Sequence, residues 1–163
     1  MDRHANKVAV VTGAGGGLGR AVALRLAAGG ARVACSDVNL DNVNAVAEEI
    51  RATGAEAHAA HVDITDVDSL GAWRESVVRE LGTPALLCNV AGILDRRFLA
   101  DLPMDDFMKV VTTNLGGTYA CTKAFLPDLL AADYGRIVNI SSISGVRGYP
   151  YPSYGASKAG MLG

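Results

Sequence analysis

The sequence predicts an α/β protein with a doubly wound parallel sheet and three layers, α/β/α. Short apolar, β-branched runs alternate five times with longer segments of helical periodicity, and the connections between them are short. The first run, KVAVV at 7–11, shows no polar alternation, which is typical of a strand buried on both faces of a parallel sheet. Parallel strands are joined by right-handed crossovers, so we expect helices on both faces.

Three predicted strands, each followed by a helix, fill the first half of the chain. Residues 17–28 repeat apolar side chains at helical spacing and stop at a Gly-Gly pair, which is typical of a helix C-terminus. Residues 40–53 carry four apolar side chains on one helical face. Asp66 is suited to cap a third helix over 67–81. The strands that precede these helices are expected at 7–11, 31–36 and 55–62.

The second half repeats the alternation with a longer helix. PALLCNV at 84–90 is the fourth predicted strand, and a helix of unusual length is expected over 104–131. Pro127 is the place where that helix is expected to bend. RIVNIS at 136–141 predicts the fifth strand, and a last helix is expected to begin near Ser153.

Composition narrows the class of protein. The chain has 163 residues, half of them apolar, and we expect one domain spanning 1–163. A net charge of −2 gives no electrostatic case for nucleic acid, and no apolar run approaches the ~20 residues of a membrane span. The start has no signal-peptide pattern, and the three cysteines show no paired spacing, so we expect a soluble cytoplasmic protein. His58 and His61 lack a third candidate ligand, so no metal site is expected.

Polar residues or glycines follow every predicted strand. The carboxyl ends of parallel strands meet at one edge of the sheet, which is where open α/β sheets bind ligands. Five such features at one edge therefore indicate a long ligand laid across it. In strand order they are the glycine loop at 12–19, Asp37, Asp63, Asn89, and the pair Ser141 and Ser142.

The glycine loop TGAGGGLG departs from the usual G-x-G-x-x-G spacing and instead reads Gly13-x-x-x-Gly17-x-Gly19. These glycines permit a turn out of the strand and a close approach of the backbone and helix N-terminus to a diphosphate. Asp37 lies twenty residues beyond Gly17, where an acid takes the hydroxyls of an adenosine ribose and repels a 2′-phosphate. No Arg or Lys occurs in the loop or directly after the acid. NAD is therefore favoured over NADP.

A second constellation surrounds the last predicted helix. Tyr154 and Lys158 are four residues apart, so their side chains share one helical face. An ammonium ~5 Å away favours a phenolate by roughly 3 kcal/mol at an effective dielectric of ~20. Tyr154 would then act as a general acid and base, and Ser142 would hold a substrate oxygen.

These motifs, in this order, resemble the short-chain dehydrogenase/reductase family of the kind with the TG-x-x-x-G-x-G loop, from about Lys7 to the last residue. The resemblance implies a Rossmann fold and hydride transfer between a nicotinamide cofactor and an alcohol or ketone. It makes Tyr154 the proton donor and acceptor, and Lys158 the group that holds the nicotinamide ribose. Ser142 would orient the substrate, and Asn114 in TTNLGGTY would support a water-linked proton relay.

The resemblance also assigns the remaining cofactor contacts. Asp63 would contact the adenine, with Ile64 beside it. The family's Asn-Asn-Ala-Gly motif is matched at 89–92, with Val90 in place of the second Asn. The implied cofactor-binding set is Gly13, Gly17, Leu18, Gly19, Asp37, Asp63, Ile64, Asn89, Ala91, Gly92, Tyr154 and Lys158.

Several readings stay open at this point. Ser141 competes with Ser142 for the catalytic role, although the family's spacing before the tyrosine selects Ser142. Arg96 and Arg97 have two interpretations: they contact an acidic substrate at the rim of a pocket, or they form a solvated pair on the surface. The segment YPYP at 149–152 forms an apolar wall of the substrate pocket or is only a stiff loop.

Members of the family are longer than this chain, so the resemblance implies that their C-terminal strands are missing here. The fifth strand would then be an unpaired edge with exposed apolar surface. In the full-length form a homodimer or homotetramer is implied. The alternative function is a dinucleotide-binding module or an inactive truncated form. A methyltransferase would share the glycine loop but would have no use for Tyr154 and Lys158.

Overall fold

The computed structural model describes residues 3–163 and contains a five-stranded parallel sheet in the order β3-β2-β1-β4-β5. All four strand pairings are parallel. The order reverses between β1 and β4, which opens a crevice at the carboxyl edge of the sheet. The doubly wound sheet predicted from the sequence is confirmed. The strands are β1 (Val8–Thr12), β2 (Arg32–Asp37), β3 (Ala57–His61), β4 (Pro84–Asn89) and β5 (Arg136–Asn139).

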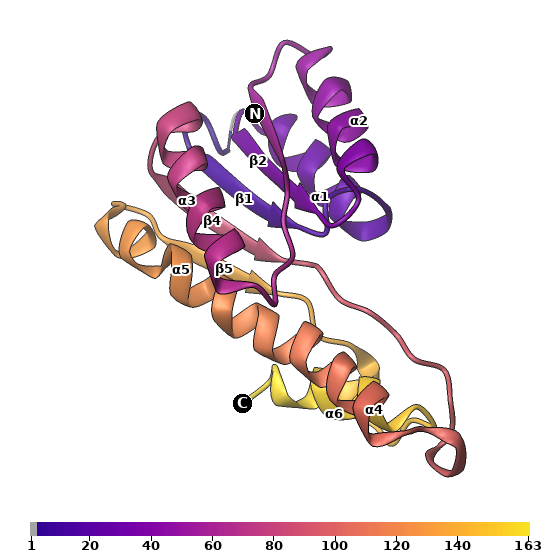
Figure 1. Ribbon diagram of the computed structural model, residues 1–163. Helices are drawn as coiled ribbons and strands as arrows, with labels where there is room; N and C mark the ends of the chain where they lie inside the picture. The colour runs from indigo at the N-terminus through magenta and orange to yellow at the C-terminus, as the bar shows by residue number, and fades with distance from the viewer. Residues whose placement is uncertain (1–2) are drawn as a thin grey trace.

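Helices cover both faces of the sheet (Figure 1). On one face Val11 and Cys35 pack with the helices α1 (Gly17–Ala27) and α2 (Leu40–Arg51). On the other face Val10, Ala34 and Leu87 pack with α3 (Val67–Leu81) and α5 (Gly117–Ala131). Successive strand residues point to opposite faces, so these apolar runs fill two cores at once.

Local signals at the helix ends behave as the sequence predicts. Asp66 caps α3, because its carboxylate accepts hydrogen bonds from the N–H groups of Asp68 and Ser69. Asn39 caps α2 in the same way by accepting from the N–H of Asn42. These caps place the start of each helix directly after the polar end of a strand.

The long helix expected over 104–131 is present in extent but is not uniform. It consists of α4 (Met104–Val111), a π-helical segment η2 (Thr112–Gly116) and α5. Pro127 lies inside α5. The π segment is an irregularity that the sequence did not indicate, and it contains Asn114. Single π turns within α-helices often occur at functional sites.

After α5 the chain adds β5 to the sheet and then continues beyond the sheet edge. β5 is followed by the short turn η3 (Ile143–Gly145) and by α6 (Pro152–Gly160). Helices α4 and α6 lie beyond the carboxyl edge of the strands (Figure 1), and a short turn, η1 (Leu99–Asp101), precedes α4. Helix α6 packs against α4 and against the turn η3 that follows β5.

β5 is the edge strand that the resemblance implied. All four of its residues are exposed, and Val138 keeps 50% of its surface accessible. Within residues 3–163, no strand pairs with its outer side. In the same part of the chain, no helix is long and apolar enough to cross a bilayer.

Candidate active site

A cavity of about 460 Å³ lies at the carboxyl edge of the sheet, where the strand order reverses. Its walls come from the turns after four strands and from the π segment. Eight of the predicted cofactor residues line it: Gly13, Leu18, Gly19, Asp37, Asp63, Ile64, Ala91 and Gly92. The sequence reasoning missed the other lining residues, which are Gly15, Gly16, Val38, Asn42, Val62, Val90, Ile93 and Thr113.

The glycine loop forms a cradle that has no room for a side chain at Gly13 or Gly19. Gly13 and Gly17 adopt φ of 65° and 50°, in the left-handed region that favours glycine. A Cβ on Gly13 would lie 2.8 Å from the Cα of Ala91, and one on Gly19 would lie 2.0 Å from the carbonyl oxygen of Gly13. Gly17 turns the chain into α1 but does not itself line the cavity.

Thr12 connects this cradle to the turn after β4. Its buried hydroxyl accepts hydrogen bonds from the N–H groups of Val90 and Ala91, at 3.0 and 3.1 Å. These two hydrogen bonds hold the 90–92 turn in a fixed position beside the start of the glycine loop. The backbone of Val90 makes this contact, so the departure from the family's second Asn leaves it in place.

Two carboxylates, those of Asp37 and Asp63, also line the cavity. The carboxylate of Asp37 accepts hydrogen bonds from the N–H groups of Gly15 and Asn39, both at 3.0 Å. One oxygen of Asp63 accepts from the N–H and the hydroxyl of Thr65, at 2.9 and 2.7 Å. These bonds stabilise the charged form and hold the pKa of Asp63 below its usual value.

Asn89 faces the sheet and does not line the cavity. Its side-chain amide nitrogen donates to the hydroxyl of Thr122 on α5 at 3.0 Å and to the carboxamide oxygen of Asn139 on β5 at 2.8 Å. Asn89 therefore binds β4 to β5 and α5, while Ala91 and Gly92 form the cavity wall.

Asn114 joins the cavity to the last helix. Its side chain is fully buried; Oδ1 accepts from the N–H of Ile93 at 2.7 Å, and Nδ2 donates to the carbonyl of Ile93 and to the hydroxyl of Ser157, each at 3.0 Å. The π segment places this side chain between the turn after β4 and α6. One residue thereby fixes the position of α6 relative to the turn after β4.

Lys158 and Tyr154 lie together at the rim. The Lys158 ammonium is 5.8 Å from the centre of the Tyr154 ring and donates to the carbonyl of Ile140, just past β5, at 2.6 Å. A Cβ on Gly92, in the cavity wall, would lie 3.6 Å from the same ammonium. Lys158 is buried, and desolvation lowers its pKa. The structure thus brings both residues, which do not line the cavity themselves, to its edge.

The two serines after β5 have different partners. The hydroxyl of Ser141 donates to the carbonyl of Lys158 at 2.7 Å and so supports the backbone of α6. The hydroxyl of Ser142 accepts from the N–H of Ser144 at 3.1 Å and donates to the hydroxyl of Ser144 at 3.2 Å. Ser141 is therefore committed to the backbone, and Ser142 remains the candidate for a substrate contact.

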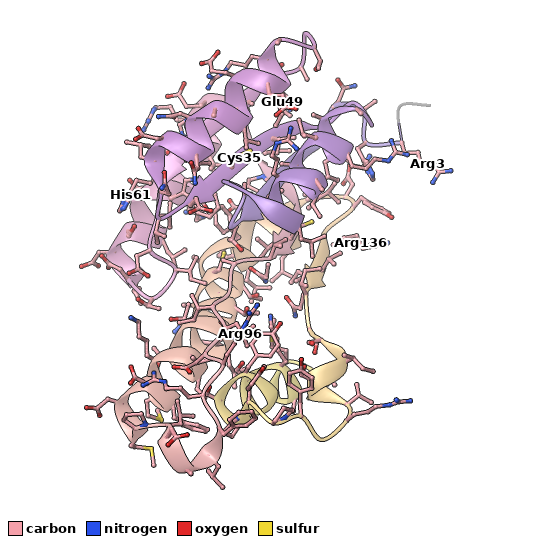
Figure 2. All side chains as sticks on the ribbon, turned by 90° about the vertical axis from the view of Figure 1, so that its right-hand side faces the viewer. Arg3, Cys35, Glu49, His61, Arg96 and Arg136 are labelled. Carbon is pink, nitrogen blue, oxygen red and sulfur yellow. The ribbon has the colours of Figure 1, made fainter. Side chains whose placement is uncertain are left out.

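Aromatic and charged side chains lie on the connection after β4 and on the segment at 149–152. The ring of Tyr151 lies 5.9 Å from that of Phe98 and 5.2 Å from that of Tyr149, so the YPYP segment packs against the connection after β4. Arg97 pairs with Asp95 and Asp106 and lowers the pKa of Asp95 to about 2. Arg96 is exposed on the same connection (Figure 2).

A second hollow, of about 650 Å³, lies near the C-terminal end of α1 and is lined by Arg3, His4 and Arg25 among others. None of the predicted site residues borders it. Among the described residues, no group of three or more His, Cys, Asp or Glu side chains is placed to hold a metal ion.

A model of the short chain dehydrogenase family matches residues 7–163. The chain belongs to this family. Its doubly wound parallel sheet is a Rossmann fold. The glycine spacing and the Tyr154–Lys158 pair are the sequence features on which the resemblance to this family rests.

Three similar proteins illustrate the range of the family. A 2-dehydro-3-deoxy-L-rhamnonate dehydrogenase (NAD(+)) from Sphingomonas sp. (strain SKA58) is 38% identical over 99% of this chain and 64% of its own length. A 3-oxoacyl-(acyl-carrier-protein) reductase from Pseudomonas aeruginosa is 37% identical over 96% of this chain and 64% of its own length. The crystal structure of an NAD+-bound xylitol dehydrogenase superposes with a TM-score of 0.94 at 37% identity, covering 98% of this chain and 62% of that one. The chain thus spans slightly less than two thirds of each.

Proposed function

We propose that this short-chain dehydrogenase interconverts an alcohol and a ketone with NAD as the cofactor. The observation that carries the proposal is the buried Lys158 ammonium, beside both Gly92 in the cavity wall and the ring of Tyr154. A structural lysine is rarely buried without a carboxylate. Here its hydrogen-bond acceptors are a backbone carbonyl and the Met161 sulfur, so a functional reason for its position is favoured.

An extended dinucleotide would lie along this cavity. The glycine cradle admits backbone approach, and the N-cap of α1, Gly16, provides no side-chain cap, so the first N–H groups of the helix are available to an anion. Asp37 would hold the adenosine ribose, and Asp63 and Ile64 would hold the adenine. NAD supplies the acceptor or donor of hydride when it is bound.

Tyr154 would transfer the proton to or from the substrate oxygen. The Lys158 ammonium lies 5.8 Å from the centre of the Tyr154 ring. Ser142 would orient the substrate oxygen from the end of β5. Asn114 would keep α6 in register with the cavity and support a proton relay through water.

NAD is preferred over NADP in this proposal because a carboxylate at Asp37 repels a 2′-phosphate. Two proteins similar to this chain also favour NAD: the 2-dehydro-3-deoxy-L-rhamnonate dehydrogenase (NAD(+)) and the xylitol dehydrogenase solved with NAD+ bound. A titration with NADH and with NADPH, followed by nicotinamide fluorescence, tests the preference. Tighter binding of NADPH would contradict it.

The catalytic proposal is tested with Tyr154→Phe. We expect turnover of a ketone panel to be abolished while the dissociation constant for NADH stays within about twofold, because only the proton-transferring hydroxyl is removed. Tyr134→Phe is the matched control, since its ring lies by Lys7 and Arg136, away from the cavity. Turnover that survives in Tyr154→Phe would refute the assignment.

A second candidate is a module that binds the dinucleotide without turnover. The observation that favours it is the exposed β5 edge directly before Ser142, where the described residues provide no further strand. NADH binding by the protein without turnover of any ketone or alcohol supplied would support this candidate.

We also propose that the protein is cytoplasmic and self-associates. Its three cysteines are free and buried, as suits a reducing compartment. On α5, Tyr119, Leu126 and Leu130 are exposed apolar side chains that a second copy would cover. Light scattering coupled to size exclusion would show a dimer or tetramer, and a strictly monomeric protein would contradict this proposal.

A further inference from the structure

Asp37 makes two hydrogen bonds with the backbone that a residue binding only the ribose would not need. Its Oδ2 accepts the N–H of Gly15, in the middle of the glycine loop, and its Oδ1 accepts the N–H of Asn39, the cap of α2. Both bonds are 3.0 Å long, and both donors are backbone groups of fixed position. The carboxylate is therefore already oriented by the protein.

The number of free acceptor sites follows from this arrangement. A carboxylate has about four lone-pair sites, two on each oxygen. One site on each oxygen is occupied by a backbone N–H, so one site on each remains. Two adjacent acceptors match the two vicinal hydroxyls of a ribose, and Asp37 lines the cavity.

The same carboxylate also holds the glycine loop. The loop has one further tie to β2, the bond from the N–H of Ala14 to the carbonyl of Ser36 at 2.9 Å. A Cβ on Gly15 would lie 2.9 Å from both Cγ and Oδ2 of Asp37, and 3.0 Å from the Cβ of Asn42. Gly15 has no positive φ, so it is the packing of this carboxylate, and not the backbone conformation, that leaves no room for a side chain.

The backbone of Asp37 is equally constrained. Its carbonyl accepts the N–H of Val62 at 3.0 Å, and its partner in the β2–β3 ladder is His61, which Figure 2 labels at the end of β3. The backbone of Asp37 is therefore held by β3, and a movement of its side chain would shift the glycine loop and leave the strand in place.

We propose that Asp37 is a positioning residue for the diphosphate-binding loop as well as a ligand of the ribose. It holds the N–H of Gly15 in place before the cofactor arrives, and its two remaining acceptor sites select the ribose diol. This inference rests on the proposed dinucleotide site and adds a coupling between its two halves: loss of the carboxylate weakens diphosphate binding even when the ligand has no ribose hydroxyls.

The test uses ADP and 2′,3′-dideoxy-ADP, titrated into the protein by calorimetry. A residue that only binds the ribose affects ADP and leaves the dideoxy ligand unchanged. For Asp37→Ala we expect the affinity for dideoxy-ADP to fall roughly tenfold, as for one lost hydrogen bond to a charged group, and that for ADP to fall further. Asp37→Asn keeps one acceptor, so its loss for dideoxy-ADP is smaller than that of Asp37→Ala.

Asp41→Ala is the matched control. Asp41 is an exposed acid in the first turn of α2 and does not line the cavity, so it reports the general effect of removing a negative charge near an anionic ligand. We expect its affinities to stay within about twofold of wild type or to rise slightly. Thermal melting of each variant establishes that it is folded.

The exchange rate of the Gly15 amide proton gives a readout without ligand. We expect it to rise in Asp37→Ala and Asp37→Asn and to remain slow in Asp41→Ala. Equal affinity of wild type and Asp37→Ala for dideoxy-ADP, with an unchanged Gly15 amide, overturns the positioning role and leaves the dinucleotide site intact. A wild-type protein that binds neither ADP nor NADH overturns the proposed function together with this inference.

Discussion

Replacement of Asn114 by alanine tests how the cavity is coupled to α6, the helix that carries Tyr154 and Lys158. The side chain makes three hydrogen bonds, two to the backbone of Ile93 and one to the hydroxyl of Ser157. Each is worth about 1 kcal/mol net, which sums to about 3 kcal/mol. Ile93 is 37% exposed and can be rehydrated, whereas Ser157 is fully buried, so we expect a loss of about 2–4 kcal/mol.

The assay is urea unfolding followed by circular dichroism, with a thermal scan beside it. A loss of this size lowers the melting temperature by about 4–16 °C in a chain of this length. Thr112→Ala is the matched control, because Thr112 is an exposed residue of the same π segment. We expect this control to change stability by less than about 0.5 kcal/mol.

A double-mutant cycle with Ser157→Ala isolates the bond that crosses to α6. We expect a coupling energy of about 1 kcal/mol between the two positions. Turnover should fall by about a hundredfold in Asn114→Ala, because a small displacement of α6 separates Tyr154 from the cofactor side. Equal melting temperatures for Asn114→Ala and Thr112→Ala, or no coupling with Ser157→Ala, would refute the reasoning.

Two further perturbations test buried charge. Burial lowers the pKa of Lys158 in the folded protein from its usual 10.5. At a pH between the folded-state and unfolded-state pKa, the unfolded chain binds more protons than the folded protein, so the free energy of unfolding rises with pH. Lys158→Met removes this rise, so its stability relative to wild type should decline from pH 7 to pH 10 in urea titrations; a difference independent of pH would contradict the assigned cause. Arg74 forms an ion pair with the buried Asp128, joining α3 to α5. Because 34% of the Arg74 side chain is exposed, Arg74→Ala should cost about 3 kcal/mol in guanidinium unfolding, near the low end for buried pairs. Adding Asp128→Asn should recover part of that loss, and a double variant less stable than Arg74→Ala would exclude an unpaired carboxylate as the reason.

The amino-acid sequence by itself determined the order of strands and helices and the edge at which the site forms. Apolar runs without alternation can be satisfied only by strands covered on both faces, and the helical segments between them impose parallel pairing. It follows that residues after successive strands, such as Gly13, Asp37 and Asp63, meet at one edge. The cap at Asp66 was equally legible, because a cap and its N–H partners lie within three residues of each other.

Only the tertiary structure decided what each polar side chain does at that edge. Asn89 faces the sheet because its side chain donates hydrogen bonds to Thr122 and Asn139. These partners are 33 and 50 residues away along the chain, so local sequence patterns do not reveal them. Ser141 is bound by the carbonyl of Lys158. The same applies to Asp37, whose hold on the glycine loop spans 22 residues. Hydrogen bonds form between groups that folding brings within about 3 Å, and distances of that kind between remote residues are not encoded in local spacing.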